Sequence, residues 1–157
     1  MRIGYGYDVH RLEAERPLVL GGVTIPFELG LAGHSDADVL LHAIADALLG
    51  ACALGDIGQH FPDTSEEYEN IDSRILLRHV RELINDKGYI VGNVDATVVA
   101  ERPKLADQIP EICHNIAADL NTGLSQVSVK ATTSEGIGFE GKEKGISARA
   151  VALLVEA

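Results

Sequence analysis

The feature that most constrains this fold is a set of three polar side chains split between two segments. Asp8 and His10 lie in RIGYGYDVHRL, and His42 lies in GHSDADVLLHAIADALLG. The Asp8-x-His10 spacing places two side chains on one face of an extended strand, whereas His42 lies in an apolar stretch with helical periodicity. If that helix packs on that strand, the three side chains form three corners of a tetrahedron. The fourth corner stays open, as in catalytic zinc sites.

The composition limits the classes of partner. The chain has 157 residues, which suits a single domain over residues 1–157, and 46% of them are hydrophobic. Aromatic residues make up 4% and tryptophan is absent, so few rings are available to stack on nucleic-acid bases. The net charge of −11 argues against nucleic acid and against anionic membranes as partners. An anionic substrate would need metal ions or helix N-termini to reverse the local sign.

The cysteines and the first residues predict a location. Cys52 and Cys113 lack paired spacing, so free thiols in a reducing cytosol are expected. A strand-like segment opens the chain in place of a leader or transit peptide, which favours a bacterial cytoplasm over a plastid. The longest apolar run, 39–54, is interrupted by His42, Asp46 and Gly50 and does not predict a membrane span.

Periodicity and turn residues predict one layer of strands and one of helices. Strands are expected over 1–11, 89–100, 127–132 and 146–155, with a hairpin at 18–25 that turns at Gly21-Gly22. Helices are expected over 35–54, over 73–87, and from Pro103 to about residue 120 with an interruption near Pro110. Segments 27–33, 55–72 and 133–145 are expected to be loops, and the composition of 146–155 leaves a helix open. The order predicts an α/β (α+β-like) two-layer sandwich, in which helices cover one face of one mixed sheet.

The helix expected from Ser35 carries a stripe of Asp38, His42 and Asp46 at four-residue spacing. Either carboxylate can accept the second N–H of a metal-bound His10 or His42, or can instead serve as a cap or a solvated surface group. A hydrogen-bonded core histidine is the alternative for His42. At the expected start of this helix, His34 and the free backbone N–H groups near Ser35 can hold a phosphate.

A second polar cluster lies in VKATTSEG, where Thr132 and Thr133 can donate to phosphate oxygens and Glu135 suits Mg²⁺ or Mn²⁺. Lys104 in ERPKL can contact a phosphate. Ordinary strand-end hydroxyls and a solvated lysine are the alternatives. These residues together indicate metal-assisted phosphoryl chemistry without defining the substrate.

Read together, four segments resemble the 2-C-methyl-D-erythritol 2,4-cyclodiphosphate synthase family of the non-mevalonate isoprenoid pathway. They are GYDVHRL, GHSDADVLLHAIADALLGACALGDIGQHFPDTS, GNVDATVVAERPKL and VKATTSEGIGFEGKEKGISARAVALL, in the family's order and covering essentially the whole chain. The H-S-D-A-D-x-x-x-H-x-x-x-D run is long enough to be highly specific. The resemblance implies that 4-diphosphocytidyl-2-C-methyl-D-erythritol 2-phosphate is converted to 2-C-methyl-D-erythritol 2,4-cyclodiphosphate and CMP, a phosphorus–oxygen lyase reaction.

The resemblance also implies roles for individual residues. Asp8, His10 and His42 would hold Zn²⁺, Glu135 would hold Mg²⁺ or Mn²⁺, and His34 and Thr133 would stabilise the transition state. The remaining implied contacts are with the erythritol phosphate (Ser35, Ile57, Phe61, Asp63), the ribose (Asp56, Gly58), and the cytidine and phosphates (Ala100, Lys104, Leu105, Ala106, Ala131, Thr132, Thr133). Leu105 and Ala106 differ from bulkier residues common in the family, and backbone contacts to cytosine should tolerate the change.

Assembly is implied in the same way. Family members are homotrimers with active sites between subunits, and their axial cavity can hold an isoprenoid diphosphate near Tyr7, Phe139 and Lys142. Lys142 stands where many members carry arginine, and a lysine binds phosphate as a point charge. Two other functions stay open from the residues alone: a zinc phosphohydrolase that uses a metal-bound water, and a non-catalytic nucleotide-binding domain stabilised by its metal.

Overall fold

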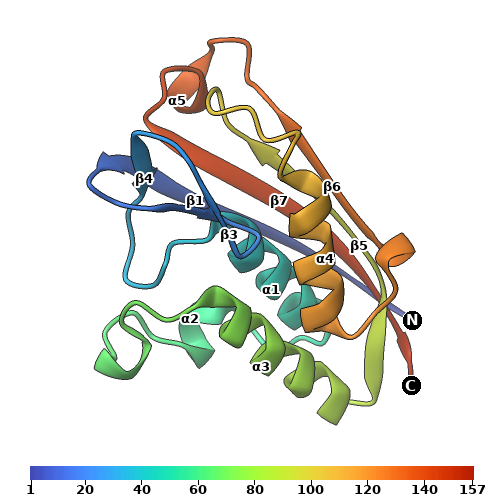
Figure 1. Ribbon diagram of the computed structural model, residues 1–157. Coiled ribbons are helices and arrows are strands. Elements are labelled where there is room, and N and C mark those ends of the chain that lie inside the picture. Colours follow the sequence, from blue (N-terminus) through green and yellow to red (C-terminus); the bar gives the residue numbers. More distant parts are fainter.

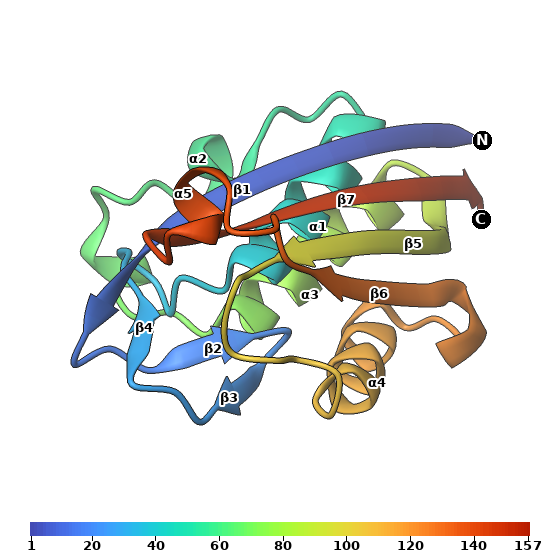
Figure 2. The same cartoon turned by 90° about the horizontal axis from the view of Figure 1, so that it is seen from above.

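A curled mixed sheet forms one layer of the protein, and helices cover one of its faces (Figure 1). The computed structural model describes all 157 residues. The strand order is β4-β1-β7-β5-β6; only β5 and β6 pair in parallel, and the other neighbours are antiparallel (Figure 2). The strands are β1 (Arg2–Ala14), β4 (Leu29–Leu31), β5 (Tyr89–Val99), β6 (Val127–Thr132) and β7 (Gly145–Glu156), with a separate hairpin of β2 (Leu18–Leu20) and β3 (Val23–Ile25). The helices are α1 (Val39–Ala51), α2 (Ile57–His60), α3 (Ser73–Asp86), α4 (Ile109–Leu120) and α5 (Gly138–Gly141), with 3-10 turns η1 (Glu66–Tyr68) and η2 (Leu124–Gln126).

Helix α1 lies directly on β1 because glycines remove the side chains between them. A Cβ built on Gly4 would lie 1.8 Å from the Ala47 carbonyl oxygen, and one on Gly6 would lie 1.9 Å from that of Ala43. Every residue of α1 except Asp46 and Gly50 is buried. The inward face of β1 therefore presents Gly4 and Gly6 to the helix and then Asp8 and His10 beyond them.

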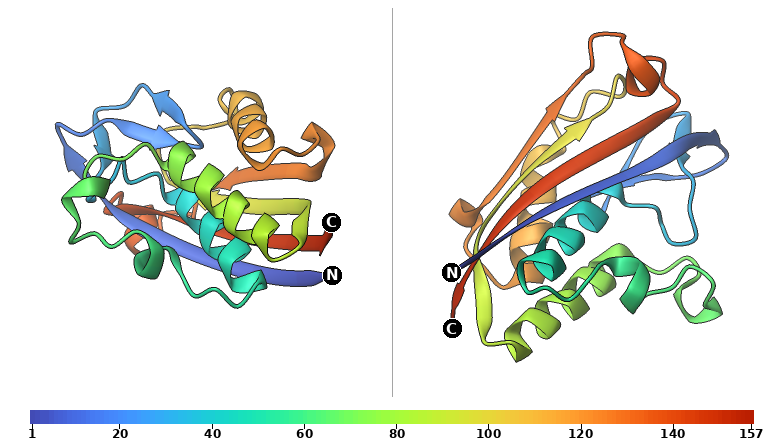
Figure 3. Two further views of the ribbon diagram at one scale, coloured as in Figure 1. Left: turned by 90° about the horizontal axis from the view of Figure 1, so that it is seen from below. Right: turned by 180° about the vertical axis from the view of Figure 1, so that it is seen from behind.

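The other face of the sheet carries only the single turn α5, at the start of β7, and none of the longer helices (Figure 3). Large apolar side chains stay exposed there: Ile3 is 72% exposed, Tyr5 61%, Tyr7 41%, Val9 42% and Val151 42%. Tyr5 and Val151 are direct cross-strand partners between β1 and β7. These five side chains, called here the uncovered apolar face, lie on β1 and β7 and do not continue from Val151 onto β5, where its partner is Asp95.

The start of α1 differs from the sequence-based prediction. The helix begins at Val39 with Asp38 as its N-cap, and the expected start at Ser35 is wrong. Ala37 has a left-handed φ of 58°, and the Ser35 and Asp36 side chains accept from the backbone N–H groups of Ala37 and Asp38. These local bonds replace helical ones, so residues 34–36 form a turn and offer no helix N-terminus to an anion.

Other boundaries were also misjudged. Segment 27–33 contains β4, which pairs with Leu12–Ala14 of β1, and 55–72 contains α2 and η1. Helix α4 begins only at Ile109, so Pro110 lies in its first turn, where a missing N–H costs nothing, and does not interrupt it. Segment 133–145 contains the single turn α5, and 146–155 is a strand in β7, which excludes the helical alternative.

The remaining elements match the predictions. The 18–25 hairpin turns at Gly21 and Gly22, whose φ values are 58° and 75°, and α3 is capped by the Asp72 side chain. Strands β5 and β6 fall where β-branched residues are dense. None of the helices is long and apolar enough to cross a membrane.

Candidate metal centre

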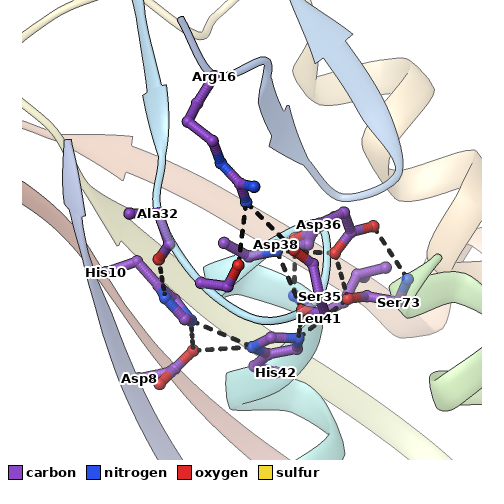
Figure 4. A network of polar contacts seen from close by, with 12 residues as sticks. Asp8, His10, Arg16, Ala32, Ser35, Asp36, Asp38, Leu41, His42 and Ser73 are labelled. Carbon is purple, nitrogen blue, oxygen red and sulfur yellow. Dashed lines mark hydrogen bonds and ion pairs between the residues drawn. The ribbon is translucent and has the colours of Figure 1, made fainter. Parts of the chain in front are cut away.

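Asp8, His10 and His42 converge at the end of the α1–β1 contact (Figure 4). The Asp8 Oδ2 atom lies 2.9 Å from His10 Nε2 and 3.1 Å from His42 Nδ1, and the two nitrogens are 3.3 Å apart. His42 is buried, and Asp8 and His10 are partly buried. One strand and one helix thus supply three donor atoms at the corners of a small triangle.

This triangle has nearly the size that a zinc ion requires. Zinc–ligand distances of about 2.0–2.2 Å in a tetrahedron separate neighbouring ligand atoms by about 3.3–3.6 Å. Two of the three separations above fall short of that range and the third lies at its lower end, so little movement would open the triangle around an ion. One carboxylate and two imidazoles leave a fourth position free, and the donor set fits a divalent ion.

Electrostatics favours a charged Asp8 next to His10. Burial raises the pKa of Asp8, but hydrogen bonds from His10 and His42 and their charges outweigh it and lower the pKa to about 2. Burial lowers the pKa of His10, but the hydrogen bond and charge of Asp8 prevail and raise it. The same contacts favour a proton on His10, so protons compete with a metal ion for this ligand.

The ring nitrogens of the two histidines that face away from the triangle have different partners. His10 Nδ1 is 2.8 Å from the Ala32 carbonyl oxygen, which can only accept, so Nδ1 carries the hydrogen and Nε2 is free for a metal. His42 Nε2 is 2.9 Å from the Ser73 hydroxyl and 3.3 Å from the Ser35 hydroxyl. Ser73 begins α3, so this contact joins the two helices at the site.

The carboxylates expected to support the histidines do something else. Asp38 accepts from the backbone N–H groups of Gly21, Gly22 and Leu41, so it caps α1 and holds the β2–β3 turn. It is fully buried, and burial together with the charge of Asp36 raises its pKa to about 6. Asp46 accepts from the Ile57 N–H at 2.8 Å and holds the start of α2. Neither carboxylate hydrogen-bonds to a histidine, and the prediction of such a partner is wrong.

A cavity of about 340 Å³ opens over the three ligands. The loop 33–35, α2 and the 61–71 segment form its walls. Nine predicted site residues line it: Asp8, His10, His34, Ser35, His42, Ile57, Gly58, Phe61 and Asp63. His34 Nε2 is 2.8 Å from the Ser65 carbonyl oxygen, which ties the loop to the opposite wall.

A second cavity, of about 430 Å³, shares no lining residue with the first. It lies where β5 and β6 end, since Ala100 N–H donates to the Thr132 carbonyl there. Seven predicted site residues line it: Ala100, Lys104, Leu105, Ala106, Ala131, Thr132 and Thr133. The metal ligands and this group therefore remain separate within one chain.

Apart from Asp38 and Asp46, the residues predicted to contact a ligand or metal that line neither cavity are Tyr7, Asp56, Glu135, Phe139 and Lys142. Asp56 caps α2 through the Gln59 N–H and is exposed. Glu135 is exposed with a left-handed φ of 57°, and its carboxylate makes no hydrogen bond or ion pair in the chain. Phe139 lies in α5 and Lys142 follows it, both exposed.

Sequence reasoning missed three polar residues around the site. Ser73 and Asp36 lie behind His42, and the only signal was a helix-capping pattern near Asp72. Arg16 donates to the carbonyl oxygens of Leu31, Gly33 and Ser35 and so holds the loop on which His34 lies (Figure 4). A lone arginine in a turn gives no sequence signal for such a role.

Comparisons with known proteins agree over nearly the full chain. The YgbB family profile matches residues 1–155. The 2-C-methyl-D-erythritol 2,4-cyclodiphosphate synthase of Geobacter sulfurreducens is 64% identical over 99% of both chains. Among solved structures, the bifunctional IspDF of Campylobacter jejuni is 40% identical with a TM-score of 0.96, over 99% of this chain and 42% of that one. A CDP complex of Plasmodium falciparum IspF is 41% identical with a TM-score of 0.87, over 99% of this chain and 96% of that one. The chain therefore belongs to the YgbB family, together with these cyclodiphosphate synthases.

Proposed function

We propose that the cavity over Asp8, His10 and His42 is the place where 4-diphosphocytidyl-2-C-methyl-D-erythritol 2-phosphate is converted to 2-C-methyl-D-erythritol 2,4-cyclodiphosphate and CMP. The observation that carries the activity is that relatives named for this synthase are 57–64% identical over 98–100% of the chain. The protein is accordingly a phosphorus–oxygen lyase of isoprenoid precursor synthesis by the non-mevalonate pathway.

The reaction needs no nucleophile from the protein. An oxygen of the substrate's 2-phosphate attacks the β-phosphorus, and the bond from that phosphorus to the bridging oxygen breaks. CMP leaves with the bridging oxygen, and the eight-membered ring closes. The chain has to bring the two phosphates together, neutralise their charge and keep water away.

Divalent ions are the proposed means of charge neutralisation in a chain of net charge −11. Asp8, His10 and His42 would hold Zn²⁺, and the unpaired carboxylate of Glu135 would hold Mg²⁺ or Mn²⁺. When bound, these ions polarise phosphoryl oxygens and offset the charge that accumulates during attack. The near-tetrahedral spacing of the first three donors supports the zinc assignment.

The smaller cavity suits the methylerythritol phosphate. The buried Ser35 hydroxyl can donate to its phosphate with His34 beside it, and Asp63 can accept from a sugar hydroxyl. Ile57 and Phe61 form apolar walls that exclude water. Gly58 and the exposed Asp56 at the start of α2 are the proposed ribose contacts.

The larger cavity suits the cytidine and its phosphates. Its walls combine backbone at Ala100, Leu105, Ala106 and Ala131 with the charge of Lys104 and the hydroxyls of Thr132 and Thr133. Thr133 together with His34 is proposed to stabilise the transition state. The CDP complex of the Plasmodium falciparum relative supports a cytidyl diphosphate ligand.

A homotrimer would unite the two cavities. The metal ligands and the Thr133 group lie in separate cavities of one chain. In a site shared between subunits, the metal cavity of one subunit would face the Thr133 cavity of its neighbour. The uncovered apolar face of the sheet supports such an assembly, since residues such as Tyr5 and Val151 would be buried in it. An isoprenoid diphosphate is a proposed ligand of the axial cavity, beside the exposed Tyr7, Phe139 and Lys142.

The whole chain is proposed to act as one synthase domain, residues 1–157, in the bacterial cytoplasm. The family profile covers residues 1–155. Cys52 and Cys113 are both free, which suits a reducing compartment.

Phosphorus NMR of the protein with the cytidyl substrate and divalent metal tests the function. CMP and a cyclic diphosphate should appear together, and a chelator should stop both. Linear products with a free phosphate would indicate the zinc phosphohydrolase instead. No turnover, with metal loss unfolding the chain, would indicate the non-catalytic domain.

A further inference from the structure

The nearest contact of His42 Nε2 does not by itself show whether this nitrogen carries the ring hydrogen. His10 faces a carbonyl oxygen, which accepts only, whereas His42 Nε2 faces the Ser73 hydroxyl at 2.9 Å, which can donate or accept. If Ser73 donated its hydrogen to His42, Nε2 would be bare, and Nδ1 would carry the ring hydrogen and donate it to Asp8 Oδ2, which lies 3.1 Å away. Nδ1 would then be unable to bind a metal.

Asp36 decides the direction of this bond. Its Oδ1 accepts from the Asp38 N–H at 3.1 Å, and its Oδ2 accepts from the Ser73 N–H at 2.9 Å. Backbone N–H groups can only donate, so both carboxylate oxygens are held as acceptors. The Ser73 hydroxyl also contacts Oδ1 of Asp36 and has one hydrogen to give. That hydrogen therefore goes to Asp36, and Ser73 must accept from His42 Nε2.

The second hydroxyl near Nε2 does not compete. Ser35 Oγ lies 3.3 Å from Nε2 and already accepts from the Ala37 N–H at 3.0 Å. As a second acceptor it reinforces a hydrogen on Nε2, and its own hydrogen remains free to point into the cavity. Ser73 is fully buried, so solvent cannot replace its hydroxyl.

We propose that Ser73 and Asp36 are positioning residues that keep His42 in the Nε2–H form, with Nδ1 directed at the metal position beside Asp8 and His10. The chain His42 Nε2–H, Ser73 Oγ–H, Asp36 carboxylate orients the imidazole and increases its strength as a ligand. It also couples the start of α3 to the metal site, since Ser73 is the first residue of that helix. The inference rests on the zinc site proposed above.

Zinc affinity of the full-length protein, measured by chelator competition, tests the proposal. Ser73→Ala and Asp36→Asn should each weaken zinc binding about 10- to 100-fold. Because both act through one chain, the double variant should bind zinc within about threefold of Ser73→Ala alone. Ser147→Ala is the matched control, because Ser147 is equally buried and donates to a carboxylate, that of Glu140, away from the histidines. Its zinc affinity should stay within about twofold of the wild type.

Nitrogen-15 NMR of histidine in the zinc-loaded wild type gives an independent readout that survives if a variant fails to fold. The His42 ring should show a hydrogen on Nε2 that exchanges slowly with water. Ser73→Ala and Asp36→Asn with wild-type zinc affinity would overturn the proposal while leaving the zinc site intact, whereas a hydrogen on Nδ1 would remove His42 as a ligand and overturn both. A wild-type protein that binds no zinc would overturn both the proposal and the metal assignment.

Discussion

At the scale of single residues, the site depends on which side chain takes the buried hydrogen bonds. Asp38 and Asp36 are two residues apart, yet Asp38 caps α1 and Asp36 reaches the start of α3. The residues of the metal triad could be predicted because a D-x-H strand and an amphipathic helix place them by local periodicity. The contact of Ser73 with His42 could not be predicted, because the two residues are 31 positions apart and meet only through the packing of α1 against α3.

Removal of one ligand should separate metal binding from folding. His42→Ala should abolish zinc binding and turnover, since two donors hold zinc far more weakly than three. The circular dichroism spectrum should stay close to that of the wild type. His114→Ala, at an exposed position on α4, should change neither property. Full turnover by His42→Ala would disprove its role as a ligand.

The raised pKa of His10 predicts a pH dependence of metal affinity. Protonated His10 cannot bind a metal, and its pKa lies above its ordinary value because of Asp8. Protons therefore begin to compete with zinc at a higher pH than for a free histidine. Zinc affinity should fall about tenfold per pH unit below that pKa and level off above it. Chelator competition between pH 5.5 and about 8.5 measures this, and an affinity independent of pH would contradict it.

At the scale of elements, the closeness of α1 to β1 sets the geometry of the site. Strands and helices with strong periodicity, such as β5, β6 and α3, could be predicted from the sequence. Strand β4 could not be predicted, because it has only three residues and is a strand only through its pairing with Leu12–Ala14 of β1. The starts of α1 and α4 were placed too early because local turns, including the left-handed Ala37, override helical propensity there.

A methyl group on β1 should therefore disrupt the site from outside it. Gly6→Ala places a Cβ 1.9 Å from the Ala43 carbonyl oxygen, so α1 must move away and carry His42 from Asp8. The free energy of unfolding should fall by about 3 kcal/mol or more, with weaker zinc binding. Denaturant unfolding and chelator competition measure the two effects.

Gly50 in α1 provides the control for Gly6→Ala. A Cβ on Gly50 meets nothing closer than 4.0 Å, so Gly50→Ala should stabilise the helix by about 0.5–1 kcal/mol and leave zinc binding unchanged. Equal behaviour of the two variants would show that close packing on β1 does not position His42.

At the scale of the whole molecule, the longer helices cover one face of the sheet and leave apolar side chains of β1 and β7 exposed on the other. The layer arrangement could be predicted from the order of elements, whereas the number of subunits could be inferred only from the family resemblance. The sequence of a strand does not reveal whether an outward-facing side chain such as Tyr5 contacts water or another chain.

A charge on this face should dissociate the proposed trimer. Val151→Glu would place carboxylates in the subunit contact, so sedimentation should show a shift from trimer to monomer with loss of turnover. Zinc binding should persist because all three ligands belong to one chain. Ile75→Glu, 51% exposed on α3 on the opposite side, should remain trimeric and active. A monomeric wild type with full activity would disprove the shared site.

Alternation along β1 links these scales. Gly4, Gly6, Asp8 and His10 face α1, whereas Ile3, Tyr5, Tyr7 and Val9 face the uncovered side. A single-residue insertion before Asp8 would turn Tyr5 and Tyr7 into the helix contact and shift the glycines outward. A substitution changes one position on one face, whereas a one-residue change in the length of this strand segment exchanges the two faces. Insertions and deletions of an odd number of residues between Arg2 and His10 should therefore be absent even among relatives whose sequences differ widely.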